Sequence, residues 1–123
     1  MTEQDIFDKY PKIFRDKDLP MTDTCMCWGL DTPSSWFPII DELCNAIETS
    51  GYIVFSKNQD GSISFPQVIA DQVKEKWNGL RFYYHLEYDK KYDGIEIEES
   101  ICSRHSSYID GMIAYAEARV ASL

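Results

Sequence analysis

The stretch from Ser34 to Gly51 constrains the fold most, because it carries the signals of one amphipathic helix. Ser34 or Ser35 can cap its N-terminus. Pro38 falls in the first turn, where a missing N–H is tolerated, and Gly51 is a natural C-terminal stop. The apolar residues recur at helical spacing and are Trp36, Ile40, Leu43, Cys44 and Ile47. Such spacing places them on one face, so we expect a helix that is buried along one side.

Two further helices are expected near the ends of the chain. Residues 3–10 form the first, which Thr2 can cap and which Pro11 bends or breaks. The second begins near Ser106 or Ser107, since serine is a favoured N-cap residue, and it continues almost to the C-terminus. Its apolar face consists of Ile109, Met112, Ile113, Ala116 and Val120.

Strand signals lie between these helices. Residues 52–56 and 62–65 read as two strands joined by a turn, and residues 80–87 read as a strand rich in aromatics. Residues 68–77 fit two structures. Their spacing of apolar residues and a Lys-Glu-Lys run favour a helix, whereas the Asn-Gly pair that follows would suit a hairpin between 68–77 and 80–87.

The size of the chain agrees with one domain. It has 123 residues, of which 44% are hydrophobic, so it can bury a modest core. Residues 16–35 are irregular yet apolar, and we expect them to lie across that core. We therefore predict a single domain over residues 1–123 with an α+β fold, in which three or four helices pack on a small antiparallel sheet.

The charge of the chain limits its partners. It carries 12 basic and 21 acidic residues, for a net charge of −9. Phosphate backbones repel such a chain, so we expect no direct binding of nucleic acid, whereas a basic protein surface would attract it. The densest acidic stretch, residues 87–99, also contains tyrosines, which suit a protein interface. The candidate partner-binding residues are Glu87, Tyr88, Asp89, Tyr92, Asp93, Glu96, Glu98 and Glu99.

A second candidate site is a local group of basic residues. In a strand over 80–87, Phe82 and Tyr84 would face one side, and the other residues would face the opposite side. That opposite side, with the preceding lysines, could bind the phosphate or carboxylate of a small molecule or nucleotide. The candidate ligand-binding residues are Lys74, Lys76, Arg81, Tyr83 and His85. The alternative is a solvated face without a ligand.

The cysteines and histidines give no motif for catalysis or metal binding. Cys25, Cys27, Cys44 and Cys102 are badly spaced for a zinc site. Cys44 also falls on the apolar helix face, where cysteine commonly packs as a small hydrophobe. Nothing near His85 or His105 in the sequence orients an imidazole for acid–base chemistry. We therefore expect no catalytic residue, metal or cofactor, and a binding protein rather than an enzyme.

Three motifs carry a resemblance to a known family. They are SWFPIIDELC at 35–44, QVKEKWNGLRFY at 72–83 and IDGMIAYAE at 109–117. The chain resembles small uncharacterised proteins of tailed bacteriophages and prophages, which carry the patterns W-x-x-I-I-D-x-L-C, Q-V-K-E-K-F-G-x-L-R-F-Y and I-x-x-M-I-x-x-A-E in this order. Trp77 stands where phenylalanine is usual, and the Cys-x-x-Cys-Gly tail of many relatives is absent. The resemblance implies a phage origin and brings no assigned activity.

These observations predict a small acidic accessory protein that binds a host or phage protein with a basic surface. It would use residues 87–99 or 16–35, for example to inhibit a host protein of defence or of nucleic-acid handling. The alternatives are a small-molecule or nucleotide-binding protein, or a virion assembly factor. A homo-oligomer is left open, with residues 25–30 as a candidate patch. The sequence has no apolar signal region or membrane span, so we expect the protein in the cytoplasm of the bacterial host.

Overall fold

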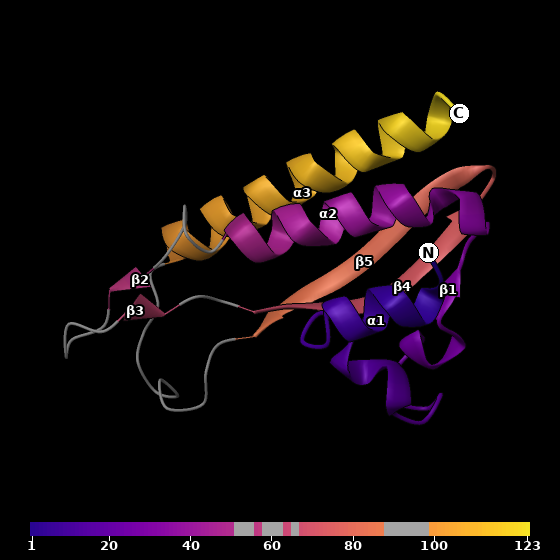
Figure 1. The fold of residues 1–123 in the computed structure, drawn as a ribbon. Coiled ribbons are helices and arrows are strands. Elements are labelled where there is room, and N and C mark those ends of the chain that lie inside the picture. Colours follow the sequence, from indigo (N-terminus) through magenta and orange to yellow (C-terminus); the bar gives the residue numbers. More distant parts are fainter. Residues whose placement is uncertain (51–55, 58–62, 65–66, 88–98) are drawn as a thin grey trace.

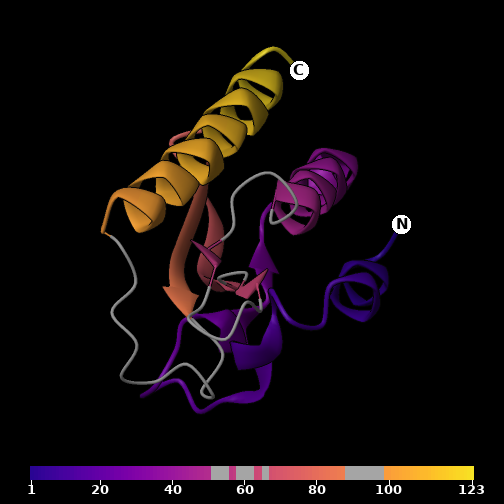
Figure 2. The same cartoon turned by 90° about the vertical axis from the view of Figure 1, so that its left-hand side faces the viewer.

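The computed structural model describes residues 1–50, 56–57, 63–64, 67–87 and 99–123. Helices α2 and α3 lie side by side over one face of a long hairpin, and the N-terminal segment lies on its other side (Figures 1 and 2). The helices are α1 (Glu3–Lys9), α2 (Phe37–Ser50) and α3 (Glu99–Ala121), and short 3-10 helices are η1 (Arg15–Asp18), η2 (Met26–Trp28) and η3 (Ser34–Trp36). The strands are β1 (Leu30–Asp31), β2 (Ser56–Lys57), β3 (Ile63–Ser64), β4 (Gln67–Lys76) and β5 (Gly79–Glu87).

The main sheet has the strand order β1-β4-β5. Strand β4 pairs antiparallel with β5, but it pairs parallel with β1. The α+β class is therefore confirmed, whereas the expected antiparallel sheet is in fact mixed. The cause is β1, a two-residue strand from the irregular segment, which no sequence signal marks. Beyond β1, the Ala70 N–H donates to the Ile13 carbonyl at 2.8 Å, so the N-terminal segment continues along this edge of β4.

The helix predicted over residues 68–77 is wrong, and the hairpin is what forms. Its turn consists of Trp77 and Asn78, whose φ angles of 53° and 63° are both positive, as a type I′ turn requires. The turn lies one residue earlier than the Asn-Gly pair suggested. A β-bulge at Asp71 explains the helical spacing, because it shifts the alternation between Ala70 and Gln72. Val68 and Val73 therefore share a buried face although an odd number of positions separates them.

The ends of the helices follow their local signals to different degrees. Thr2 forms the expected cap of α1, since its hydroxyl accepts from the Asp5 N–H at 3.2 Å and its own N–H donates to the Asp5 carboxylate at 2.7 Å. The α-helix α2 begins at Phe37, after the 3-10 turn η3 that contains both candidate serines. The predicted start of the last helix at Ser106 or Ser107 is wrong, because α3 begins at Glu99. Serine favours helix ends but is tolerated inside a helix that is stabilised by packing.

The core lies between the two long helices and the facing side of the hairpin. Phe82 is buried on this side and Tyr84 packs against the core, whereas Tyr83 is exposed, which confirms the predicted division of faces in β5. The Tyr84 hydroxyl donates to Asp110 on α3 at 2.7 Å. Buried side chains come from every layer, including Ile6, Phe14, Met26, Ile40, Leu43, Val73, Phe82, Ile109 and Ile113.

The small hairpin between α2 and β4 is described only in part. Ser56 pairs with Ser64 and Lys57 with Ile63 in an antiparallel arrangement, which confirms that these two stretches pair. The other residues of the predicted strands, 52–55, 62 and 65, lie outside the described residues. Within the described part of the chain, no helix is long and apolar enough to cross a membrane.

Candidate functional site

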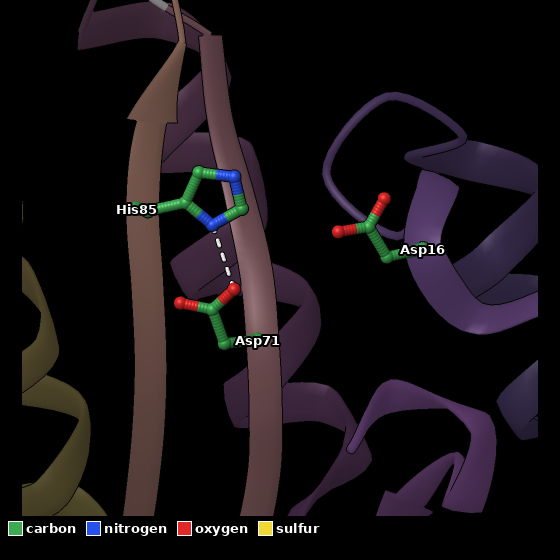
Figure 3. A group of neighbouring side chains, drawn as sticks. All are labelled: Asp16, Asp71 and His85. Carbon is green, nitrogen blue, oxygen red and sulfur yellow. Dashed lines mark hydrogen bonds and ion pairs between the residues drawn. The ribbon is translucent and has the colours of Figure 1, made fainter. Parts of the chain in front are cut away.

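A histidine and two aspartates from three separate elements meet beside the sheet (Figure 3). Asp16 belongs to η1, Asp71 to β4 and His85 to β5. One carboxylate oxygen of each aspartate and one ring nitrogen of His85 lie within 4.8 Å of one another. All three side chains are partly buried. We call these residues the histidine–carboxylate cluster.

The β-bulge in β4 positions Asp71 for this cluster. Ala70 is opposite Tyr84 and Gln72 is opposite Tyr83, so Asp71 is the extra residue between them. A bulge of this kind turns a side chain away from its regular direction. As a result, Asp71 Oδ1 lies 2.6 Å from Nδ1 of His85 on the neighbouring strand.

Asp16 reaches the cluster from the opposite side. Figure 3 shows its carboxylate on the η1 coil, directed toward the two strands. The 3-10 helix that carries it packs against β4. Ile69, which pairs with His85, is fully buried on this side of the sheet. The N-terminal segment therefore covers this part of the sheet and brings Asp16 to its rim.

The second ring nitrogen of His85 has a partner of its own. Nε2 lies 2.9 Å from an oxygen of Glu87, whose other oxygen accepts from the Arg15 guanidinium. Burial acts to lower the pKa of His85, but hydrogen bonds to Glu87 and Asp71 outweigh it and raise the pKa above its ordinary value. The hydrogen bond from His85 and then that from Arg15 lower the pKa of Glu87.

These contacts hold the imidazole between two carboxylates, with a third nearby. Such an arrangement favours a positive charge at its centre, which a proton on His85 supplies in part. Carboxylate oxygens and imidazole nitrogens are also ligands for divalent metals. The cluster can therefore take up either a proton or a metal cation.

The basic residues of the second predicted site share one side of the β4–β5 hairpin but do not converge. Lys74 is opposite Arg81 and lies 5.8 Å above the ring of Tyr83, whereas Lys76 lies next to the turn. His85 is four residues farther along β5 than Arg81, which is about 13 Å in a strand. It belongs to the histidine–carboxylate cluster. The structure thus separates His85 from the cations with which it was grouped.

Tyr83 lines a surface hollow of about 380 Å³ on this side of the sheet. Its other walls are Asp71 and Gln72 of β4 and the loop from Met21 to Cys25. The hollow therefore joins the hairpin to the irregular segment, which sequence reasoning had treated as a separate feature.

Only two of the predicted partner-binding residues can be placed. Glu87 ends β5 and bonds to His85 and Arg15, and Glu99 is the first residue of α3. The other six, Tyr88, Asp89, Tyr92, Asp93, Glu96 and Glu98, lie outside the described residues.

The irregular segment exposes apolar side chains as well as burying some. Met26 and Leu30 are buried, as expected of a segment that lies across the core. In contrast, Met21 is 68% exposed and Trp28 is 67% exposed. Trp28 lines a shallow hollow of about 220 Å³ together with Asp18 and the buried Met26. An aromatic ring, an acid and a solvent-exposed thioether thus occur on one segment.

The cysteines occupy different environments. Cys44 is buried on α2, where burial raises the pKa of its thiol, so the prediction that it packs as a hydrophobe is confirmed. Cys25 is exposed and Cys27 is half-buried. His105 is buried on α3, and burial lowers the pKa of its imidazole. A zinc site that includes Cys44 would need this thiol to leave the core.

Sequence reasoning did not single out Asp16 or Asp71. Neither residue stands in a motif, and only the bulge and the packing of η1 bring them to His85. A hairpin alignment of 67–76 with 79–87 is the one signal that points to this side of the sheet. Comparison of the chain with protein-family models, with curated proteins and with solved structures found no significant match.

Proposed function

We propose that this protein acts by binding another protein, and that residues 16–31 form the docking surface. The observation that carries the proposal is the exposed Trp28, which shares a hollow with Asp18. Tryptophan is enriched among the residues that contribute most to protein–protein affinity. An exposed large apolar side chain on a firmly anchored segment is therefore a good docking element.

The segment is preorganised for binding. Its chain is anchored by buried Met26 and Leu30, and the Met26 N–H donates to the Thr24 hydroxyl at 3.0 Å. Gly29 has a φ of 72°, and Glu3 lies where a Cβ would project from it. A surface that is already ordered loses little conformational entropy when a partner binds.

The charge of the segment indicates what kind of partner fits. Residues 16–31 contain four aspartates and one lysine, and the whole chain has a net charge of −9. An acidic surface steers a basic partner toward it and repels nucleic acid. Together with the resemblance to phage proteins, this favours a basic host or phage protein, such as one that itself handles nucleic acid. Inhibition of that partner is the activity we expect.

The test is a pull-down from a bacterial lysate, followed by affinity measurements with the purified partner. We expect one basic partner that is lost at high salt, because screening weakens exposed charge pairs. Trp28→Ala should weaken binding by about 30-fold or more, as expected of a residue worth about 2 kcal/mol. Asp18→Lys should weaken it mainly at low salt.

Trp77→Ala is the matched control, because Trp77 is also exposed but lies at the hairpin turn. Its affinity should equal that of the wild type. The proposal is wrong if Trp28→Ala and Asp18→Lys bind as the wild type does, or if Trp77→Ala alone abolishes binding. Recovery of a partner whose binding does not depend on salt would contradict the electrostatic part.

A second candidate function rests on the hollow beside Tyr83. Its volume of about 380 Å³ falls within the range of small-molecule sites. A nucleotide or another small polar molecule that binds there would raise the melting temperature, since it binds only the folded state. A thermal-shift panel with wild type and Tyr83→Ala tests this function. A shift that is the same in both proteins would exclude the hollow.

A further inference from the structure

We propose that Asp16, Asp71 and His85 form a binding site for a divalent first-row metal ion, for which zinc is the best fit. The set combines one imidazole and two carboxylates, which are ligands that zinc accepts. This site is separate from the docking surface of the proposed function, although η1 contributes to both.

The distances are close to those of a coordination sphere. The three donor atoms lie within 4.8 Å of one another, and the pair Asp71 Oδ1 and His85 Nδ1 is 2.6 Å apart. Ligands at about 2.0–2.1 Å from a tetrahedral zinc lie about 3.3 Å from each other. The required change is therefore a small rotation of side chains: Asp16 moves inward and the close pair moves slightly apart.

The imidazole is already oriented as a metal ligand. A histidine that binds a metal through one nitrogen commonly donates its other N–H to a carboxylate, which fixes the tautomer. Here Nε2 of His85 is 2.9 Å from Glu87, and Arg15 in turn donates to Glu87. This chain leaves Nδ1 directed at Asp71 and the metal position. It is an observation independent of the number of acidic residues in the cluster.

The charges are matched to a divalent ion. The two aspartates carry two negative charges, and His85 contributes a neutral ligand when a metal displaces its proton. Arg15 is the competing cation, since its Nε lies 3.6 Å from Asp16. The side chains of Asp71 and His85 are partly exposed. Water can therefore complete the coordination, and the ion can exchange with solvent.

The position of the site in the fold gives metal binding a structural consequence. The ligands lie on η1, β4 and β5, so an ion would join the N-terminal segment to the hairpin. Because the unfolded chain does not keep these ligands together, the metal would stabilise the folded state by mass action.

The first experiment is calorimetric titration with zinc chloride. Cys25 and Cys27 could bind zinc by themselves, so the titration is done on wild type and on the Cys25→Ser/Cys27→Ser variant. We expect one ion per chain in the double variant. Asp71→Asn and His85→Gln in that background should each lower the affinity by about 100-fold. Glu87→Gln keeps all three ligands and should lower it by about 10-fold, as outer-shell changes commonly do.

Asp18→Asn is the matched control, because it removes an aspartate two residues from Asp16 without touching the site. Its affinity should be unchanged, and circular dichroism verifies that each variant is folded. Histidine ring NMR of the Cys25→Ser/Cys27→Ser variant gives a readout that needs no ligand substitution: zinc should shift the His85 signals and leave those of buried His105 in place. The proposal is overturned if zinc binding disappears with the two cysteines, if His85→Gln binds zinc normally, or if zinc leaves the His85 ring signals unchanged.

Discussion

Replacing Trp77 with asparagine should stabilise the protein. Trp77 has a φ of 53° in the hairpin turn, a region that bulky residues rarely occupy and that asparagine tolerates. The left-handed conformation costs an ordinary residue about 1–2 kcal/mol. The ring is 84% exposed, so its main loss is the contact with Lys76, whose Nζ lies 4.8 Å from the ring centroid. Such an exposed contact contributes about 0.5–1 kcal/mol.

The difference between these terms predicts a gain of about 0.5–1 kcal/mol for Trp77→Asn, or about 2–6 °C in melting temperature. Urea unfolding should show a higher midpoint with an unchanged slope. Trp77→Ala separates the two terms, because alanine keeps the backbone strain and loses the contact with Lys76. We expect it to be slightly destabilised. If Trp77→Asn were destabilised as much as Trp77→Ala, the side-chain contact and not the backbone would decide the stability of this turn.

Three further substitutions test the packing. Tyr10→Phe removes two hydrogen bonds from a buried hydroxyl to Asp41, at 2.9 and 3.0 Å, and should cost about 1–2 kcal/mol in urea unfolding; an unchanged midpoint would contradict this. Gly29→Ala places a Cβ at a φ of 72° and should cost about 1–3 kcal/mol, measured by thermal unfolding, whereas a neutral result would mean that this turn relaxes freely. Burial and the bond to Asp110 raise the pKa of Tyr84 to about 12, so its neutral form stabilises the fold below pH 10 and this contribution is lost between pH 10 and 12. Tyr84→Phe should therefore be less stable than wild type at pH 8 by about 1 kcal/mol, and unfolding measured against pH should show the gap closing at alkaline pH rather than widening.

The sequence alone determined the elements whose signals lie within a few residues of each other. Thr2 and Asp5 mark the start of α1, and the apolar stripe of α2 identifies the helix and its buried face, including Cys44. The alternation in β5 likewise predicted which side Tyr83 would face. Capping, helical spacing and strand alternation are local interactions, so the order of residues is sufficient to reveal them.

The tertiary structure decided what depends on distant partners. Residues 67–76 form a strand because β5 and β1 supply its hydrogen bonds, although their spacing also suits a helix. The early start of α3 and the parallel pairing of β1 carry no local signal.

The histidine–carboxylate cluster belongs to the same class. Asp16, Asp71 and His85 are far apart in the chain, and a regular hairpin would turn Asp71 to the other face of the sheet. A bulge and the packing of η1 bring them together. A side-chain direction that is set by one extra residue in a strand depends on the pairing of that strand, and pairing exists only once the chain has folded.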